Sequence, residues 1–280
     1  MTDPTFEKSH SDLTPLLEPR SIAVVGASQR PGSFGHYLYT NLRNSGFRGV
    51  LYPVNPNHRH IETVPTVSDL AHLPEPVDLA ILLVPAPLVP EVARQGVEAG
   101  TVRSLMVLSG GFRESGAQGA EYEDELQHIA QAARVPLVGP NCVGITNTDP
   151  TVRMHGMFAD RPMPQHGRVA FVSQSGALCL SILDAARSRG IGFSKFISIG
   201  NDLCHLCFDG SIFLLSDCEA SNHRHQTSCH GAGIGGGGTS PRGRGSCSKI
   251  VQEGLAGGLS LNSIKKTSLK NLFWFKGIQL

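Results

Sequence analysis

The sequence predicts an α/β protein, with a doubly wound parallel sheet followed by the start of a second α/β domain. From Ser21 to Gly200, short β-branched runs that end in Gly or Pro alternate with amphipathic stretches of about three turns. The short runs are apolar on both faces, which is typical of parallel strands covered by helices on each side. An antiparallel sheet would instead show polar and apolar residues in alternation, joined by two-residue turns. Right-handed crossovers then favour the doubly wound arrangement.

The elements of the first domain follow in order along the chain. Two amphipathic stretches, Pro90 to Ala99 and Glu121 to Ala133, are predicted as helices, and a further helix is expected to end near Asn44. The predicted strands are residues 22–26, 50–54, 79–84, 105–108 and 136–138. Together they place a first domain at residues 12–148.

A second domain begins after a break. Residues 149–167 are rich in Pro, Met and His without periodicity, and are expected to form a linker or lid. A strand at 168–173, a sharp turn, a helix that ends near Gly190 and a strand at 193–199 then start a second unit. We expect this second domain, residues 168–202, to be incomplete.

The pattern stops near Asn201, and residues 203–280 are expected to be irregular. Five of the seven cysteines lie there, with a run of four glycines from Gly235. A zinc module built on Cys204 and Cys207 conflicts with the tight His223-x-His225 spacing, so no metal site is predicted. A disordered tail is the second possibility, although Cys and Trp are unusual in one. A shifted reading frame or a mis-joined gene is the interpretation we favour.

Composition and charge exclude several classes of protein. The formal net charge is +1, which leaves no strong field to draw the chain to nucleic acid or an anionic membrane. The polar, acidic start differs from a secretory signal, and the most apolar stretch, Val77 to Val89, is interrupted by prolines. Cys142 and Cys179 have no disulfide spacing. These features predict a cytoplasmic protein.

A glycine-rich loop follows the first strand and precedes a helix. Glycines at 26, 32 and 35 let the backbone turn tightly and approach a ligand, and the N–H groups at the helix start favour a phosphate. The spacing is longer than the G-x-G-x-x-G dinucleotide fingerprint of Rossmann domains. The second strand ends in Asn55-Pro56-Asn57 rather than in the Asp or Glu that binds an NAD ribose. That favours a ligand with a phosphorylated ribose, NADP or coenzyme A, although Asn55-Pro56 alone is also typical of a strand-ending turn.

Three more Gly/Pro turns are predicted at the carboxyl ends of strands, where open α/β sheets bind ligands. They are residues 84–87, 109–114 and 139–144. Each could be a plain chain reversal, but four such turns on one sheet edge favour a binding site.

These segments together resemble the NDP-forming acyl-CoA synthetases, which include ADP-forming acetate–CoA ligase and the succinyl-CoA synthetase α subunit. The resemblance covers about residues 12–202 and depends on six motifs in the family's order. The motifs are PRSIAVVGAS at Pro19, YPVNP at Tyr52, VPAP at Val84, SGGF at Ser109, GPNC at Gly139 and VSQSGA at Val172. It implies a Rossmann-like CoA-binding domain followed by a flavodoxin-like, succinyl-CoA-synthetase-type ligase domain.

The resemblance also implies roles for particular residues. The CoA-binding set comprises Gly26, Ser28, Arg30, Pro31, Gly32, Gly35, Asn55, Val84, Pro85, Ser109, Gly110, Gly111, Asn141 and Cys142. In this set the loop from Ser28 to Gly35 cradles the CoA phosphates and Asn55 faces the nucleotide end. Val84, Pro85 and residues 109–111 line the pantetheine path, with Asn141 and Cys142 near the thioester. A phosphate-binding helix start comprises Ser173, Ser175, Gly176 and Ala177, although Ser175 alone fits an ordinary N-cap.

The implied reaction converts acyl-CoA, ADP and phosphate to acid, CoA and ATP through an acyl phosphate and a phosphohistidine. The phosphohistidine cannot be identified, because nothing around His230 supports the required loop. The ATP-grasp unit that binds ATP or ADP with Mg is missing, so it is expected as a partner subunit or domain, and the chain alone is expected to be inactive. His36, His58, His60, His155 and His166 are interpreted as surface or lid residues.

Two other functions stay open. One is a non-catalytic CoA-sensing module, as in the regulatory regions of protein lysine acetyltransferases; a fused acetyltransferase domain would distinguish it, and none is visible in this chain. An NADP oxidoreductase is disfavoured by the long glycine loop and the lack of a recognisable substrate domain. Acyl specificity and oligomeric state are not predicted.

Overall fold

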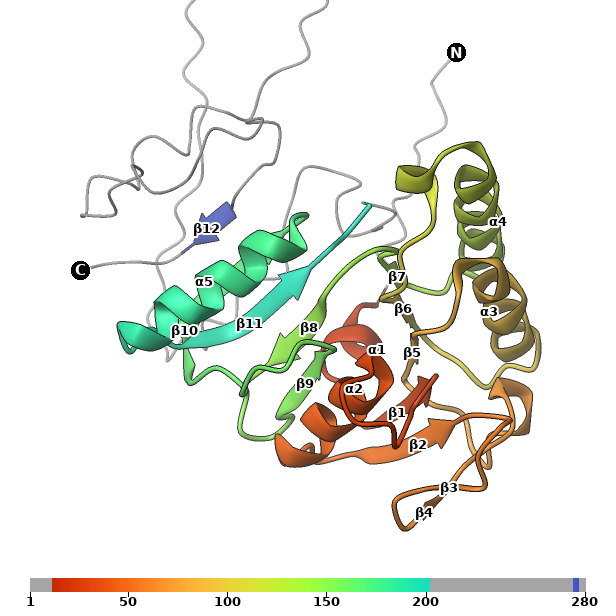
Figure 1. The fold of residues 1–280 in the computed structure, drawn as a ribbon, viewed down its shortest axis with the longest axis horizontal. Coiled ribbons are helices and arrows are strands. Elements are labelled where there is room, and N and C mark those ends of the chain that lie inside the picture. The colour runs from red at the N-terminus through yellow and green to blue at the C-terminus, as the bar shows by residue number, and fades with distance from the viewer. Residues whose placement is uncertain (1–11, 202–273, 277–280) are drawn as a thin grey trace, which may run out of the picture.

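The computed structural model describes residues 12–201 and 274–276, and it confirms the predicted parallel α/β sheet (Figure 1). The main sheet has the order β2-β1-β5-β6-β7, and all its neighbouring strands run parallel. Its strands are β1 (Ser21–Val25), β2 (Val50–Val54), β5 (Leu79–Leu82), β6 (Leu105–Val107) and β7 (Leu137–Val138). The predicted strand positions are therefore correct to within a few residues.

Beside β2, on the outer edge of the main sheet, a sixth strand position is represented by a single bridged residue, Val67. After β2 the chain forms a small hairpin of β3 (His60–Ile61) and β4 (Val64–Pro65), and Val67 then makes an isolated parallel bridge to Val54. Counting Val67 as a vestigial third strand beside β2 gives the order 3-2-1-4-5-6 of a Rossmann sheet. The strand order therefore reverses between β1 and β5, where such sheets bind ligands.

Helices cover both faces of this sheet. On one face lie α3 (Val89–Glu98) and α4 (Ala117–Ala133), and on the other lie α1 (Thr14–Leu17) and α2 (Phe34–Asn44) (Figure 1). Single 3₁₀ turns, η1 (Leu70–His72), η2 (Ala86–Leu88) and η3 (Arg113–Ser115), complete the connections.

The second sheet has the order β12-β10-β11-β8-β9 and mixes strand directions. β10 (His166–Ser173) and β11 (Phe193–Ser198) run parallel and are connected by α5 (Gly176–Ser188), as predicted. β8 (Gly144–Asn147) and β9 (Met154–Met157) form an antiparallel hairpin, and β12 (Trp274–Lys276) pairs antiparallel with β10. The antiparallel pairs were not predicted, and residues 149–167 are not solely a linker, because β9 lies within them.

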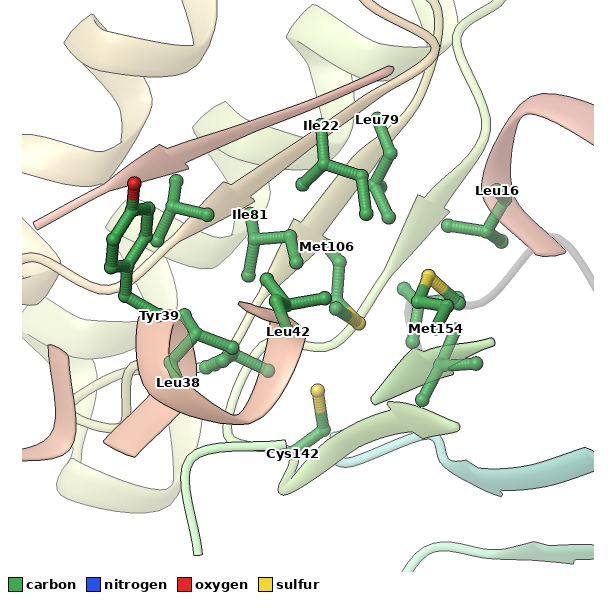
Figure 2. Close-up of a cluster of buried hydrophobic side chains, with 14 of the residues drawn as sticks. Leu16, Ile22, Leu38, Tyr39, Leu42, Leu79, Ile81, Met106, Cys142 and Met154 are labelled. Atoms are coloured by element: carbon green, nitrogen blue, oxygen red, sulfur yellow. The ribbon is translucent and has the colours of Figure 1, made fainter. Parts of the chain in front are cut away.

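The two sheets share one hydrophobic core. Figure 2 shows Met154 of β9 and Cys142 directed into the same cluster as Ile22, Leu42 and Met106 of the first sheet and its helix. Ile145 of β8, Ile197 of β11 and Ile199, which follows β11, are buried in this cluster as well. A cut near residue 148 would remove apolar side chains that cover the first sheet, so experiments need the whole chain.

The expectations for residues 203–273 and 277–280 fall outside the described residues, and so does His230. Within the described part, none of the helices combines the length and apolar character that a bilayer crossing requires.

His155 is not a surface or lid residue, because its side chain is buried on β9 with 1% exposure. Its Nδ1 lies 2.8 Å from the Thr146 hydroxyl oxygen, and its Nε2 lies 2.9 Å from the Arg161 carbonyl oxygen. Burial lowers the pKa of His155 below its usual 6.5, and the bond to the Arg161 carbonyl only partly opposes this effect. The folded chain therefore holds His155 neutral.

We expect the free energy of unfolding to fall as pH drops below about 6.5. In that range the unfolded chain binds a proton at His155 and the folded chain does not, so each pH unit costs up to about 1.4 kcal/mol. Urea unfolding between pH 8 and 5.5 measures this slope for the wild type and for His155→Gln, which keeps an N–H donor but cannot titrate. Equal slopes in the two proteins would contradict the assignment.

Candidate functional site

Five turns meet along one edge of the main sheet, at the carboxyl ends of its parallel strands. We call them the carboxyl-edge turns: residues 26–35 after β1, 55–57 after β2, 84–88 after β5, 109–114 after β6 and 139–142 after β7. All the predicted CoA-binding residues lie in these turns.

Side-chain and backbone bonds join the turns into two groups, one after β5, β6 and β7 and one after β1 and β2. The Ser109 hydroxyl donates to the Val84 carbonyl at 2.5 Å, and the Asn141 N–H donates to the Ser109 carbonyl at 2.8 Å. At the other end, Asn55 Nδ2 donates to the Ala27 carbonyl at 2.8 Å. Within each group the turns therefore hold each other in place rather than reversing the chain independently.

The glycine-rich loop ends on a capped helix. Ser33 is the N-cap of α2, and its hydroxyl oxygen accepts from the His36 N–H at 3.3 Å. The Ser28 hydroxyl oxygen accepts from the Arg30 N–H at 3.1 Å. Gln29, Arg30, Pro31 and Gly32 are exposed, and Gly32 has φ +80° with no atom near the position of a side chain. The loop thus offers open backbone beside a helix N-terminus, an arrangement that suits a phosphate.

A basic corner lies where this loop touches the segment after β2. Gln29 Nε2 donates to the His60 carbonyl at 2.6 Å, which ties the two segments together. Arg30, His58 and Arg59 are all exposed around this contact. The corner can therefore attract a second phosphate.

Asn55 has mainly a structural part in this arrangement. Its Oδ1 accepts from the Asn57 N–H at 2.9 Å while its Nδ2 binds the Ala27 carbonyl. The strand-ending turn is therefore present, and its side chain braces the start of the glycine loop. Its predicted contact with the nucleotide end of a ligand stays a prediction.

Cys142 and Asn141 differ sharply in exposure. Asn141 is exposed with φ +57°, whereas Cys142 is 2% exposed and its thiol lies 3.3 Å from the Val107 carbonyl oxygen. Burial raises the pKa of the Cys142 thiol to about 12. The thiol points into the core (Figure 2), so only the backbone of Cys142 is available at the sheet edge.

The predicted phosphate turn lies beside the last carboxyl-edge turn. Ser175 is the N-cap of α5, and a side chain at Gly176 would collide with Val143, the residue after Cys142. The buried Ser173 hydroxyl oxygen accepts from the Ser175 N–H at 3.1 Å. The Ser175 amide is therefore occupied, and the N–H groups that can face a ligand are those of Gly176 and Ala177, which lack partners within the helix.

Sequence reasoning missed a polar group that joins the two domains. Asn201, just beyond β11, contacts Glu114 and Glu123, and its N–H donates to the Pro140 carbonyl at 2.9 Å. Glu114 lies in the predicted turn of residues 109–114, but no sequence pattern assigns its side chain a role. Asn201 stands where the sequence pattern stops, so only the tertiary contact identifies it.

A separate groove of about 790 Å³ lies between α3 and α4. It contains none of the predicted site residues, and its acidic side chains include Glu98, Glu121 and Glu125. The candidate site is therefore the set of carboxyl-edge turns, where backbone donors and glycines converge.

Comparison with known proteins identifies the domains of this chain. Residues 20–148 match the family model of a CoA binding domain, and residues 166–217 match that of a succinyl-CoA ligase like flavodoxin domain. The chain belongs to the NDP-forming acyl-CoA synthetase family. The second match ends at residue 217, among residues that the structure does not describe.

Two relatives of this chain are ADP-forming acetate–CoA ligases. The chain is 44% identical over 188 residues to ADP-forming acetate–CoA ligase I of Archaeoglobus fulgidus, which covers 66% of this chain and 26% of the relative. It is 39% identical over 204 residues to the α subunit of ADP-forming acetate–CoA ligase II of Pyrococcus furiosus, covering 73% of this chain and 43% of the subunit. The chain thus spans less than half the length of these relatives.

Solved structures show the same fold. The dinucleotide forming acetyl-coenzyme A synthetase 1 of Candidatus Korarchaeum cryptofilum, in complex with phosphate and ADP, is 33% identical with a TM-score of 0.65. That alignment covers 70% of this chain and 41% of the other. A Pyrococcus horikoshii OT3 protein is 37% identical with a TM-score of 0.64, over 69% and 43% of the two chains.

Proposed function

We propose that this chain is the CoA-binding part of an NDP-forming acyl-CoA synthetase and that CoA lies along the carboxyl-edge turns. The observation that carries the proposal is the set of five turns along one sheet edge, which begins at a capped helix N-terminus and ends beside a second one. Its length suits an elongated ligand with phosphates at one end and a reactive group at the other. The cysteines at 142 and 179 are free thiols, which fits a cytoplasmic setting.

The nucleotide end of CoA would lie at the glycine loop. Backbone N–H groups between Ser28 and Gly35 would bind the pyrophosphate, aided by the dipole of α2. The exposed guanidinium groups of Arg30 and Arg59 would take the phosphate on the ribose, because charge-assisted bonds to phosphate are the strong ones.

The pantetheine arm would then run over the turns after β5, β6 and β7. Val84 and Pro85 supply apolar contacts, and Gly110, the exposed residue of the turn after β6, supplies accessible backbone. The thiol end would arrive near Asn141 and the backbone of Cys142. That position is next to the start of α5, where the N–H groups of Gly176 and Ala177 would hold the phosphoryl group of an acyl phosphate.

The complete reaction would convert acyl-CoA, ADP and phosphate to acid, CoA and ATP. It requires a phosphohistidine and a nucleotide-binding unit outside the described residues. We propose an ATP-grasp subunit or domain as the partner, since the Pyrococcus furiosus relative is a separate α subunit of such a ligase. Mg would enter with the nucleotide on that partner. On its own the chain would bind CoA without turnover.

We expect the whole chain to bind CoA saturably, with NADPH weaker and dephospho-CoA about tenfold weaker. The tenfold loss corresponds to about 1.4 kcal/mol, the scale of one charge-assisted bond from the basic corner. Isothermal titration calorimetry with the three ligands measures the order. NADPH binding tighter than CoA would contradict the CoA site, and equal binding of CoA and dephospho-CoA would contradict the role of the basic corner.

A further inference from the structure

Asn201 uses all of its side-chain polar atoms to join three segments. Its Nδ2 donates to Glu114 Oε2 at 2.5 Å and to Glu123 Oε2 at 2.9 Å. Its Oδ1 accepts from Asn141 Nδ2 at 3.1 Å. Through the hydrogen bonds of this one residue, the second domain therefore contacts the carboxyl-edge turns after β6 and β7.

Glu114 connects Asn201 to the backbone of its own turn through hydrogen bonds. Its Oε1 accepts from the N–H groups of Gly111 at 2.6 Å and Phe112 at 3.1 Å. Burial raises the pKa of Glu114, but the bonds from Asn201 and from these amides outweigh it and lower the pKa overall. An ionised carboxylate thus holds the turn on one side and Asn201 on the other.

Glu123 anchors the buried side of the group. Its side chain is 2% exposed, and Oε1 accepts from Arg113 Nε at 2.9 Å. Its Oε2 also accepts from the Arg113 N–H at 3.3 Å. The Arg113 guanidinium balances this buried charge, and the amide of Asn201 supplies the remaining donor.

We propose that Asn201 is a positioning residue that shapes the Gly110–Phe112 turn through Glu114, which makes the second domain part of the pantetheine subsite. The inference rests on the proposed CoA site, in which this turn lines the pantetheine path. Gly110 and Gly111 have no side chains to fix their backbone, so the Glu114 carboxylate fixes it from outside. Glu114 and Asn141 are exposed, so a ligand can reach the surface that they hold.

The contacts demand an amide at residue 201. Asp has the same shape but would remove both donated bonds and place a third carboxylate against Glu114 and Glu123. Because CoA is adenosine 3′,5′-bisphosphate extended by a phosphate and pantetheine, the nucleotide fragment alone probes the site without the arm. The proposal therefore predicts that Asn201→Asp weakens the binding of CoA and leaves the binding of adenosine 3′,5′-bisphosphate nearly unchanged.

The test measures the Kd of CoA and of adenosine 3′,5′-bisphosphate by calorimetry on the full chain. We expect Asn201→Asp to weaken CoA at least about tenfold and the nucleotide fragment less than about twofold. Glu114→Gln, at an exposed position, should give the same selective loss, because its amide would face the Asn201 amide donor to donor. The double variant N201D/E114Q restores a donor and acceptor pair, so it should bind CoA at least about threefold tighter than N201D.

Asn147→Asp is the matched control. Asn147 is a buried asparagine in β8 of the second sheet, and its Nδ2 donates to the carbonyl of Leu17 in α1 at 2.8 Å, but it lies outside the carboxyl-edge turns. It should lower stability and leave the ratio of the two Kd values unchanged. Wild-type binding of CoA combined with unchanged CoA binding by folded N201D or E114Q would overturn the positioning role alone. Failure of the wild type to bind CoA would overturn the proposed function itself.

Discussion

Gly35→Ala is expected to abolish measurable CoA binding and to destabilise the chain by about 3 kcal/mol. A methyl group at Gly35 would overlap the carbonyl oxygen of Gly26, which is backbone and cannot rotate away. The start of α2 would have to move off the end of β1, and overpacking of this kind costs up to about 3 kcal/mol. Because the glycine loop spans these two points, CoA affinity should fall at least about 100-fold, equivalent to about 2.7 kcal/mol.

Gly32→Ala is the control for this result. Gly32 has open space around it, so the methyl group meets no protein atom, and only its φ of +80° opposes an L-residue, at about 1 kcal/mol. We expect a small loss of stability and about fivefold to tenfold weaker CoA binding, because the methyl group intrudes where the ligand approaches. Calorimetry and urea unfolding measure both quantities. A Gly35→Ala protein with wild-type stability and wild-type CoA affinity would show that the close approach of α2 to β1 is not required.

Ala177→Pro is expected to weaken phosphate binding at the start of α5 at least about tenfold while the helix stays folded. Proline removes the N–H of Ala177 and changes little else, since the first turn of a helix tolerates proline. The chain itself contains this arrangement, with Pro90 in the first turn of α3. One charge-assisted bond to phosphate contributes about 1.5–3 kcal/mol, which exceeds a tenfold change.

Phosphorus NMR titration with inorganic phosphate measures this loss, with CoA present to occupy the glycine loop. Ala177→Gly serves as the control, because it keeps the N–H and should bind phosphate almost as the wild type does. Circular dichroism checks that α5 persists in both variants. If Ala177→Pro binds phosphate as tightly as the wild type, the anion lies elsewhere and the start of α5 is an ordinary capped helix.

The parallel strands and their helices could be predicted because each carries its own pattern. A run such as Leu79 to Leu82 is apolar on both faces, and α3 repeats its apolar residues with helical spacing. The β8–β9 hairpin was missed because all eight of its residues are buried, which leaves no alternation to detect. His155 was misplaced for the same reason, since a polar residue buried by a partner strand looks like a surface residue in sequence.

The sequence by itself determined the parallel sheet, the glycine loop and the motifs that identify the family. These features depend on neighbours along the chain: strand periodicity, turn residues and the capping serines Ser33 and Ser175. Only the tertiary structure decided which of those residues can meet a ligand. It directs the Cys142 thiol into the core, and it engages the side chains of Asn55 and Ser173 in hydrogen bonds within the protein. It also brings Asn201 to Glu114 across 87 residues of sequence. Hydrogen-bond partners that far apart are set by how the two sheets pack, and no local pattern encodes that packing.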